Sequence, residues 1–357
     1  MRILVVTSGC DRSELALYEG WVKAGLCVDL VCESETPRQD ALRSAGIRVH
    51  HQAIRHRLDF QAVKNLRNRL RTHDYDILYA PRNHSLSVSL LASRGMKVKR
   101  VAYRGTSGHL SRLDPASWLT YLNPGIHTVI CVSHAVRRYL LTMGLPPKRL
   151  ATIYKGHDIS WYADDGMPDL SAFKIPEKAF IVGFIGNMRP VKSVDSLIQA
   201  ALHLPPSSPV HFLLVGKVQD KRIPKLADDP RIRSRIHLAG FLPNAASMAK
   251  AFHVFVMPSA KREGLPRAVI EAMAQGVPAI VSDVGGMPEI VDHGASGLVV
   301  PPRDPKALAH AIASLSQDTL RCRQLGEKAR RRIREHFNIR DTISQTIDLF
   351  HRLSGEM

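Results

Sequence analysis

Short apolar runs alternate with stretches of helical spacing along the first half of the chain. Each run is rich in Val, Ile and Leu, and polar or glycine residues follow it. Apolar runs that alternate with amphipathic segments are typical of a parallel α/β domain, in which helices cover the faces of the sheet. The strands expected in this half are residues 3–7, 28–32, 77–80, 100–103, 129–132 and 150–154.

The same alternation restarts after a polar connection. Residues 161–177 contain aspartates, a glycine and prolines, and this composition indicates an interdomain segment. We therefore predict one domain over residues 1–165, a linker over 166–178 and a second domain over 179–335. The strands expected in the second domain are residues 180–185, 210–215, 236–240, 254–257 and 279–282. Glycine or polar residues follow these strands, at the edge where open α/β sheets bind ligands.

The composition is that of a globular protein, and 357 residues are enough for two domains that each have a core. No apolar run approaches the length of a membrane-spanning helix, and the first residues lead into an expected strand rather than into a cleavable signal. These features favour the cytoplasm. The five cysteines are scattered and odd in number, so we expect free thiols rather than disulfides or a zinc site.

The formal net charge of +18 is unevenly distributed. Residues 43–112 contain 15 Lys and Arg against three Asp, whereas the rest of residues 1–173 is slightly acidic. A second basic cluster lies at residues 321–340. Nucleic acid is excluded as the main partner because the basic stretch lacks interleaved aromatic residues and no recognised nucleic-acid motif occurs.

A helical pattern with many cations runs over residues 55–71. Its apolar positions, which recur at helical spacing, are Phe60, Val63, Leu66 and Leu70. Two interpretations stay open and are compatible. The cationic face meets an anionic phospholipid surface, or the helix is simply solvated while its apolar stripe packs on its own core. The candidate membrane-contacting residues are Arg55, Arg57, Lys64, Arg67, Arg69 and Arg71.

One segment of the second domain carries the strongest functional signal. Two carboxylates, Glu263 and Glu271, are separated by seven residues across an expected loop-to-helix junction. Gly264 allows close backbone approach and Pro266 suits the first helical position, so we expect a helix over about residues 265–276. The free amides of a helix N-terminus attract anions. Carboxylates beside such amides match the hydroxyls and phosphates of a nucleotide sugar.

This E-x7-E pattern resembles the signature of retaining GT-B glycosyltransferases of family four, the glycosyl transferases group 1. The resemblance is strong over residues 180–302 and looser over residues 1–170. It implies two Rossmann-like α/β domains that face a cleft, with the final helix, in residues 336–357, crossing back to the N-terminal domain. It also implies an enzyme that moves a sugar from a nucleotide-sugar donor to an acceptor with retention of configuration.

The resemblance assigns Glu271 to the ribose hydroxyls and Glu263 to the donor sugar. Arg189 and Lys192 match the cations that hold the donor diphosphate. Because no D-x-D segment follows a strand, these cations are expected to serve in place of a metal, and no metal or other cofactor is expected. The further donor-site candidates are Gly9, Gly186, Gly216, Lys217, Phe241, Leu242, Gly264 and Leu265. Whether Phe241 stacks on the base or only packs in its loop stays open.

The loop after residues 100–103 departs from the family pattern. Many relatives carry a His-Gly pair there, whose His approaches the donor sugar. This chain has Arg104, Gly105 and Thr106 instead, and His109 follows further along the loop. Either Arg104 replaces that His or His109 fills its place, so these residues are candidates for contact with sugar or acceptor. The catalytic candidates are Arg189, Lys192, Glu263 and His109.

The resemblance leads us to expect a UDP-sugar donor and a glycan or glycolipid acceptor, in the assembly of lipopolysaccharide or another cell-envelope polysaccharide. The family's front-face mechanism needs no classical base, because the leaving diphosphate assists deprotonation. The basic N-terminal half suits an acceptor at the inner face of the cytoplasmic membrane. The alternatives are a nucleotide-sugar epimerase of the same fold, hydrolysis or phosphorolysis of glycosides, and a non-enzymatic polyanion-binding protein.

Overall fold

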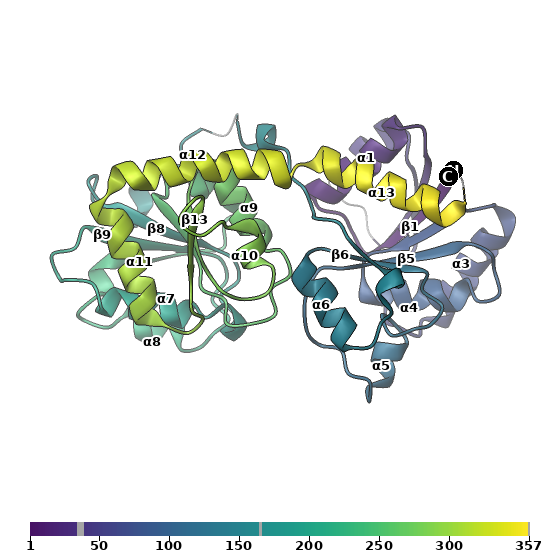
Figure 1. Cartoon of the computed structure of the whole chain (residues 1–357), viewed down its shortest axis with the longest axis horizontal. Helices are drawn as coiled ribbons and strands as arrows, with labels where there is room; N and C mark the ends of the chain where they lie inside the picture. Colours follow the sequence, from purple (N-terminus) through teal and green to yellow (C-terminus); the bar gives the residue numbers. More distant parts are fainter. Residues whose placement is uncertain (34–38, 164–165, 356–357) are drawn as a thin grey trace. The chain divides into compact units, whose positions relative to one another are not determined.

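The computed structural model describes residues 1–33, 39–163 and 166–355. The chain forms two compact units (Figure 1). The first contains Met1–Gly156 together with Ile339–Met357, and the second contains His157–Asn338. Each unit is a parallel sheet with helices packed against it.

The first unit is built on a seven-stranded sheet in the order β3-β2-β1-β4-β5-β6-β7. Its strands are β1 (Arg2–Thr7), β2 (Cys27–Cys32), β3 (Arg48–His51), β4 (Ile77–Ala80), β5 (Lys99–Arg104), β6 (Thr128–Cys131) and β7 (Leu150–Thr152). The order runs outward in both directions from β1, so the winding reverses beside the first strand, where open α/β sheets place ligands. Ile3 and Val5 enter one core cluster, and Leu4 and Val6 enter the other, so both faces of β1 are buried.

The helix α13 (Ile339–Ser354) belongs to this first unit although the second unit precedes it in the sequence. It packs along α1 (Figure 1), where a Cβ added at Gly20 would lie 2.3 Å from Ile343 Cδ1. The ring of Phe350 lies 5.1 Å from that of Trp21, centroid to centroid, in the buried cluster. The other helices of the unit are α1 (Arg12–Lys23), α2 (Gln39–Ser44), α3 (Phe60–Thr72), α4 (Asn83–Ala92), α5 (Pro115–Trp118), α6 (His134–Thr142) and the short η1 (Pro147–Arg149).

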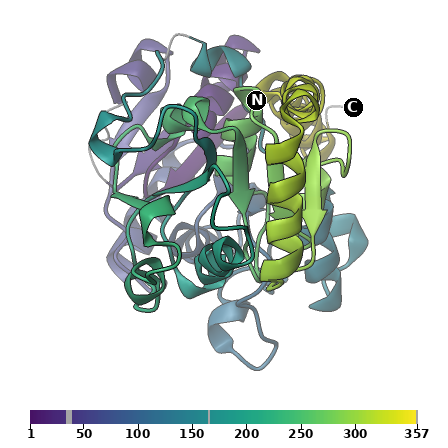
Figure 2. The ribbon, with the colours of Figure 1, turned by 90° about the vertical axis from the view of Figure 1, so that its left-hand side faces the viewer.

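The second unit repeats the architecture with a six-stranded sheet in the order β10-β9-β8-β11-β12-β13. Its strands are β8 (Phe180–Ile185), β9 (Val210–Val215), β10 (Ile236–Gly240), β11 (Val254–Met257), β12 (Ala279–Ser282) and β13 (Gly297–Val300). Figure 2 looks onto this unit, with α11 beside β13. The helices are α7 (Val194–Leu202), α8 (Ile223–Ala227), α9 (Arg267–Ala274), α10 (Met287–Ile290), α11 (Pro305–Gln317) and α12 (Thr319–His336), with short turns η2 (Ile159–Tyr162), η3 (Ser171–Phe173), η4 (Pro190–Lys192), η5 (Arg233–Arg235) and η6 (Ala245–Ala251).

Two strands escaped the sequence analysis, and both lie at a sheet edge. β3 has the sequence Arg-Val-His-His, and its side chains are partly or fully exposed, so no apolar run marks it. β13 begins at Gly297, where a Cβ would lie 2.1 Å from the Ala279 carbonyl oxygen. Only a glycine allows that close pairing, and glycine weakens the local strand signal.

The apolar stripe of α3 differs from the expected one. Phe60 is the first residue of this helix and its side chain is 74% exposed. Ala62 and Leu66 are the buried residues of the helix, and Val63 and Leu70 pack partly buried against the same core cluster. Phe60 precedes Ala62 by two residues and therefore points well away from the core. Among the described helices, none is long and apolar enough to cross a membrane.

Candidate functional site

Glu263 and Lys192 meet at the carboxyl edge of the second sheet. Glu263 follows β11 and is 8% exposed, and Lys192 follows the neighbouring strand β8. The Lys192 Nζ atom lies 2.7 Å from Glu263 Oε1, which also accepts a 2.6 Å hydrogen bond from the hydroxyl of Ser259. Ser259 is fully buried. The two predicted residues are thus brought together as an ion pair, with a hydroxyl that the sequence analysis did not identify.

Gly285, which was not predicted as a site residue, packs against the backbone of Glu263. Gly285 has φ +60°, and a Cβ there would lie 1.9 Å from the Glu263 carbonyl oxygen. Glycine is the residue type that adopts this left-handed backbone conformation and allows such a close approach without a steric clash. The loop after β12 therefore fixes the backbone position of Glu263.

The helix α9 begins two residues later than predicted. Pro266 is extended, with ψ 115°, and precedes the first helical residue Arg267 instead of occupying the first helical position. Pro266 makes no side-chain cap, and the Val269 amide already bonds to the Pro266 carbonyl. The prolyl ψ angle explains the shift, because a helix cannot include a residue in that region. A proline before the helix supplies no side-chain oxygen to the first amides, unlike the residues preferred at that position.

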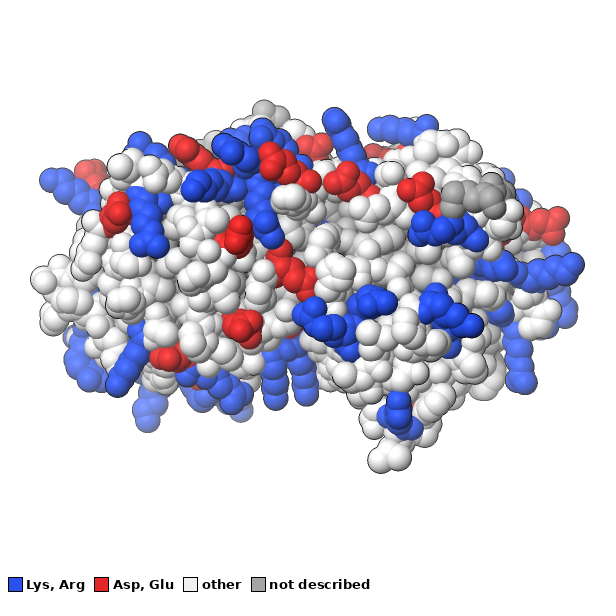
Figure 3. Space-filling view, viewed as in Figure 1, with Lys and Arg blue, Asp and Glu red and all other residues white. Residues whose placement is uncertain are grey.

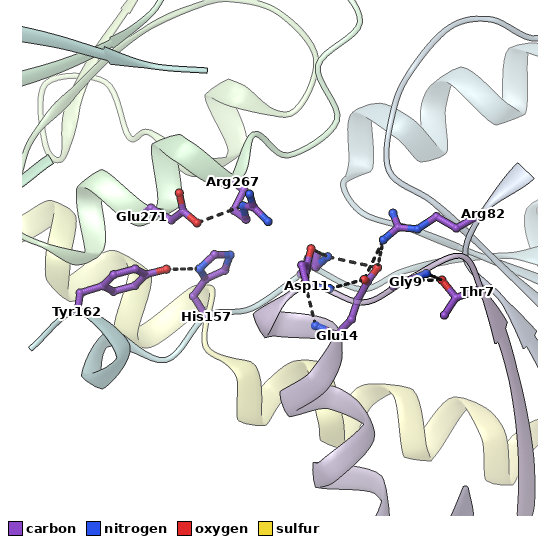
Figure 4. Close-up of polar contacts among 10 residues, drawn as sticks. Thr7, Gly9, Asp11, Glu14, Arg82, His157, Tyr162, Arg267 and Glu271 are labelled. Atoms are coloured by element: carbon purple, nitrogen blue, oxygen red, sulfur yellow. Dashed lines mark hydrogen bonds and ion pairs between the residues drawn. The ribbon is translucent and has the colours of Figure 1, made fainter. Parts of the chain in front are cut away.

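Glu271 lies one turn into α9 and pairs with Arg267, a residue the sequence analysis missed. The Arg267 Nε atom is 3.1 Å from Glu271 Oε1. The Glu271 side chain is 14% exposed and that of Arg267 is 57% exposed. Figure 4 shows this pair, and also, from the same unit, His157 at 2.7 Å from the hydroxyl of Tyr162. The spacing of four residues on a predicted helix was the available signal for Arg267.

Two predicted glycines lie side by side where β8 and β9 end. Gly186 and Gly216 have φ of +151° and +137°, and a Cβ on Gly216 would lie 2.0 Å from the Gly186 carbonyl oxygen. They let the two strand ends approach each other. Arg189, three residues after Gly186, is exposed, and no ion pair of its side chain occurs within the described ranges.

Lys217 and Phe241 follow neighbouring strands and contact each other. The Lys217 Nζ atom lies 5.3 Å from the centroid of the Phe241 ring, which is 63% exposed. Leu242 is half-buried. An exposed aromatic ring with a cation on one face offers an apolar surface to a planar ligand.

In the first unit, two acidic and two basic side chains pair with one another near the end of β1. Figure 4 shows Arg82 donating to both carboxylate oxygens of Glu14, at 3.0 and 2.8 Å. Lys155 lies 2.6 Å from Asp11 and 3.5 Å from Glu14. These four residues were not predicted from the sequence, although the D-x-x-E spacing at residues 11–14 is a capping-box signal. Glu14 is buried, which its sequence position alone does not reveal.

The predicted Gly9 lies in the loop next to that network. The hydroxyl of Thr7 donates to the Gly9 carbonyl at 2.8 Å. A Cβ at Gly9 would meet nothing within 4 Å, so this position keeps open space in front of the backbone. The open space is compatible with the expected role beside a donor.

Arg104 stabilises the loop that follows β5 through hydrogen bonds within that loop. It is 5% exposed, its guanidinium lies 4.5 Å from the centroid of the Tyr121 ring, and it donates to the carbonyl oxygens of Thr106 and Gly108. His109 is exposed and has φ +61°. The loop borders an open cavity of about 400 Å³ in the first unit. The other polar residues lining this cavity include Ser8, Glu33, Arg82, Asn83, His84 and Thr106.

The six basic candidates on and before α3 differ in their surroundings. Arg67 donates to the carbonyls of Ala92 and Arg94 at 2.9 and 3.0 Å, so its guanidinium holds the end of α4. Arg57 and Arg69 are half-buried. Arg55, Lys64 and Arg71 are exposed. Lysines and arginines are spread over the face shown in Figure 3, with acidic residues among them.

No group of three or more His, Cys, Asp or Glu side chains suited to a metal ion occurs in the described part of the chain. The five cysteines are free thiols. The metal-free reaction stays a prediction.

Two family models together match most of the chain. The model described as "Glycosyl transferases group 1" matches residues 169–332, and the model "Glycosyltransferase Family 4" matches residues 7–161. Among curated proteins, N-acetyl-alpha-D-glucosaminyl L-malate synthase of Bacillus anthracis is 29% identical over 62% of this chain and 59% of its own length. This chain thus spans about three fifths of that relative.

Two further matches extend over nearly the whole chain. The UDP-Gal:alpha-D-GlcNAc-diphosphoundecaprenol alpha-1,3-galactosyltransferase of Escherichia coli is 22% identical over 98% of this chain and 95% of its own. Among solved structures, Anabaena HepE (Alr3699) in complex with UDP has a TM-score of 0.79 and 22% identity, and covers 99% of this chain and 100% of that one. The latter likeness shows the fold.

Proposed function

We propose, from the premise that the chain belongs to the group 1 glycosyltransferases, that it transfers a glycosyl group from a UDP-sugar to a glycan or glycolipid acceptor. The matches to these two family models support glycosyltransferase activity. HepE has been solved with UDP and with UDP-glucose, and the E. coli relative is named for a UDP-galactose donor and a lipid-linked acceptor. These names support a uridine nucleotide and a lipid-linked glycan acceptor. We propose that the glycan belongs to the cell envelope, as lipopolysaccharide does.

The proposal depends on two ion pairs of the second unit, whose carboxylates lie in the loop and helix that follow the carboxyl end of β11. Lys192 with Glu263 and Arg267 with Glu271 place two cations and two carboxylates near the start of α9, which a proline precedes. A nucleotide sugar needs both kinds of group, because its phosphates require donors and its hydroxyls require acceptors.

Each side chain then has a role in donor binding. Glu271 accepts hydrogen bonds from the ribose, and Glu263 accepts them from the donor sugar. Lys192, the exposed Arg189 and the first amides of α9 bind the diphosphate. The Phe241 ring, with Lys217 on it, stacks on the base.

The catalytic contribution is electrostatic. As the glycosyl group leaves, charge builds up on the diphosphate, and preorganised cations and amides stabilise it. The leaving phosphate takes the proton of the acceptor hydroxyl on the same face, which retains the anomeric configuration and needs no separate base. Cations already supply the positive charge that a metal would provide, so the proposed reaction is metal-independent. Assay with excess EDTA should leave the rate unchanged, and a loss that magnesium restores would contradict this.

The first unit is proposed to receive the acceptor. The cavity bordered by Arg104 and Thr106 is open and polar, as a sugar-binding surface requires. The exposed cations Arg55, Lys64 and Arg71 favour an anionic membrane surface as the place where a lipid-linked acceptor is met. Peripheral attachment to the inner face of the cytoplasmic membrane follows from this proposal.

Thermal unfolding with UDP, GDP, ADP, CMP and their sugars tests the donor. UDP and one UDP-sugar should raise Tm most, because a ligand at 100 times its Kd stabilises the native state by about 2.7 kcal/mol. The Lys192→Ala variant should lose the shift. Lys221→Ala, which alters an exposed lysine with no role in the site, is the matched control. A larger shift with another nucleotide would reassign the base, and no shift with any would refute the donor site.

A further inference from the structure

The cavity of about 400 Å³ in the first unit lies where several strands of the sheet end. Ser8, Glu33, Pro81 and Arg104 line it, and each of them ends or directly follows one of the strands β1, β2, β4 and β5. These strands are consecutive neighbours in the order β2-β1-β4-β5. The cavity therefore lies at the carboxyl edge of the sheet, beside the strand where the winding reverses.

The first turn of α4 borders this cavity. The helix has ten residues and begins at Asn83, and Arg82 before it makes no side-chain cap. Asn83, His84 and Ser85 all line the cavity. The Leu86 amide bonds to the Arg82 carbonyl, so the amides of the three residues before it have no partner within the helix. Such a helix start carries partial positive charge and favours an anion.

Ser85 is a buried polar residue in this first turn. It is 1% exposed, and no hydrogen bond of its hydroxyl occurs within the described ranges of the chain. Buried hydroxyls are normally hydrogen-bonded in native proteins. Because Ser85 lines the cavity, a molecule bound there can supply an acceptor for its hydroxyl.

Arg104 brings a buried cation to the same cavity. It is 5% exposed and donates to the carbonyls of Thr106 and Gly108, and its guanidinium lies 4.5 Å from the centroid of the Tyr121 ring. Carbonyl oxygens and a ring face orient the guanidinium but do not neutralise it. Within residues 1–33, 39–163 and 166–355, no carboxylate pairs with Arg104. A buried charge is costly unless an opposite charge meets it.

The other charged residues of the cavity do not offset Arg104. Arg82 donates to both carboxylate oxygens of Glu14, so its own charge is met (Figure 4). Among the described lining residues, the carboxylate is that of Glu33, whose side chain is exposed. The buried part of the lining therefore carries a positive charge that no buried carboxylate balances.

We propose that this cavity binds a phosphate or carboxylate group of the acceptor. The first amides of α4 and the Ser85 hydroxyl donate to the anionic oxygens, and Arg104 supplies the counter-charge. A cavity of this volume accommodates a sugar that carries such a group. This inference rests on the proposed function, in which the first unit receives the acceptor, and it names the acceptor's chemical class as an acidic or phosphorylated sugar.

Titration calorimetry of the full chain in saturating UDP tests the preference for an anion. UDP occupies the donor site, so binding of phosphate groups at that site does not contribute. Glucose 6-phosphate and glucuronate should bind at least about tenfold more tightly than glucose, because only they accept charge-assisted hydrogen bonds. Equal affinity for the three, or affinity for none, would overturn the inference. Inorganic phosphate that binds as tightly as the sugar phosphate would overturn the assignment to an acceptor.

Substitutions in the cavity test the residues. Arg104→Gln should weaken binding of glucose 6-phosphate about tenfold, and Ser85→Ala about fivefold. Lys97→Ala, at an exposed lysine of the same unit outside the cavity lining, is the control and should bind like the wild type. All three variants should keep the Tm increase with UDP, which shows that they are folded. Unchanged binding in both cavity variants would overturn the site, whereas failure of UDP to stabilise the wild type would refute the donor proposal instead.

An isosteric pair at Ser85 tests the charge of the cavity without any ligand. Ser85→Asp places a carboxylate at the α4 start, and Ser85→Asn places a neutral amide of the same shape there. The Asp variant should have the higher Tm and should no longer bind glucose 6-phosphate, because its carboxylate takes the place of the anion. An equal or lower Tm would overturn the inference. In the Arg104→Gln background the difference in Tm should shrink, and an unchanged difference would overturn the role of Arg104.

Discussion

The helices α1 and α9 each begin after a buried strand, β1 in the first unit and β11 in the second, but the residues at their starts differ. In α1, Asp11 accepts the Glu14 amide at 3.0 Å and Glu14 accepts the Asp11 amide at 3.0 Å. In α9, an extended proline precedes the first residue and makes no side-chain cap. The residue that caps the first helix with its carboxylate is thus replaced by a proline in the second.

The charged side chains near the two helix starts are similar in exposure. Glu14 is buried between Arg82 and Lys155, and Glu263 is buried beside Lys192. Arg82 and Lys155 are 41% and 21% exposed, while Lys192 and Arg267 are 16% and 57% exposed. The two helix starts therefore differ in the residue that precedes the helix, an aspartate for α1 and a proline for α9, and in our proposal the second helix start receives the anion.

Removal of a charged donor-site residue should have the largest effect. Lys192→Ala or Glu271→Ala should lower turnover at least about 100-fold, because each removes a contact that stabilises charge or holds the nucleotide. Steady-state assays with UDP-sugar measure this. The reference variant is again Lys221→Ala. Near-normal rates in both site variants would mean that the second unit does not hold the donor at α9.

Gly285→Ala should weaken donor binding by about tenfold without removing any donor-site side chain. Its Cβ would lie 1.9 Å from the Glu263 carbonyl, so the Glu263 loop has to move, and small displacements in a site are costly. Gly294→Ala provides the control, because it has φ +77° but no atom within 4 Å of its Cβ. Titration calorimetry with UDP distinguishes the two. Equal loss in both variants would show that backbone strain, and not the contact with Glu263, is responsible.

Acid should destabilise both units below about pH 6.5. Burial lowers the pKa of His127 to about 4, and burial also lowers that of His253. Each ring Nδ1 accepts a backbone amide, from Arg100 and Ile181, at 3.0 and 2.9 Å. The unfolded chain binds the proton first, so the stabilisation is complete above the unfolded pKa and declines as pH falls toward the folded one.

Urea unfolding at pH 7.5 and pH 5 measures this decline. His127→Asn should reduce the pH dependence, while His203→Asn, at an exposed histidine, should not change it. An unaltered slope in the His127 variant would assign the acid sensitivity to other groups.

Asp11→Ala should have the smallest effect. Loss of a helix cap costs about 1 kcal/mol of unfolding free energy, and here an ion pair with Lys155 is lost as well. If the α1 start serves only the fold, UDP affinity stays the same. A selective loss of UDP affinity in this variant would mean that the first unit also binds the donor, and would remove the contrast between α1 and α9.

The predicted α/β fold of the GT-B type is confirmed, and the strands explain why it was predictable. β8 and β11 are fully buried apolar runs, which a local pattern reveals. The approach of Lys192 to Glu263 follows from β8 and β11 being neighbours in the sheet. Both residues were assigned to one donor site through the family resemblance, and their ion pair was not predicted. Arg82 was missed because its partner Glu14 lies 68 residues away in the sequence. Ser259 was missed although it lies only four residues before its partner Glu263. Pro266 was placed one position too far into the helix, because its ψ angle is not encoded by its type.

The packing of Phe350 against Trp21 has a consequence for synthesis on the ribosome. Residues of the second unit are continuous in sequence, whereas the first unit needs α13 to fill its core. The amino-terminal part therefore emerges first but cannot complete its core until residues 339–354 have left the exit tunnel. The second unit can fold in the meantime, which reverses the usual order of co-translational folding. A nascent chain from which residues up to 338 have left the exit tunnel would present a finished second unit and a first unit that still exposes Trp21.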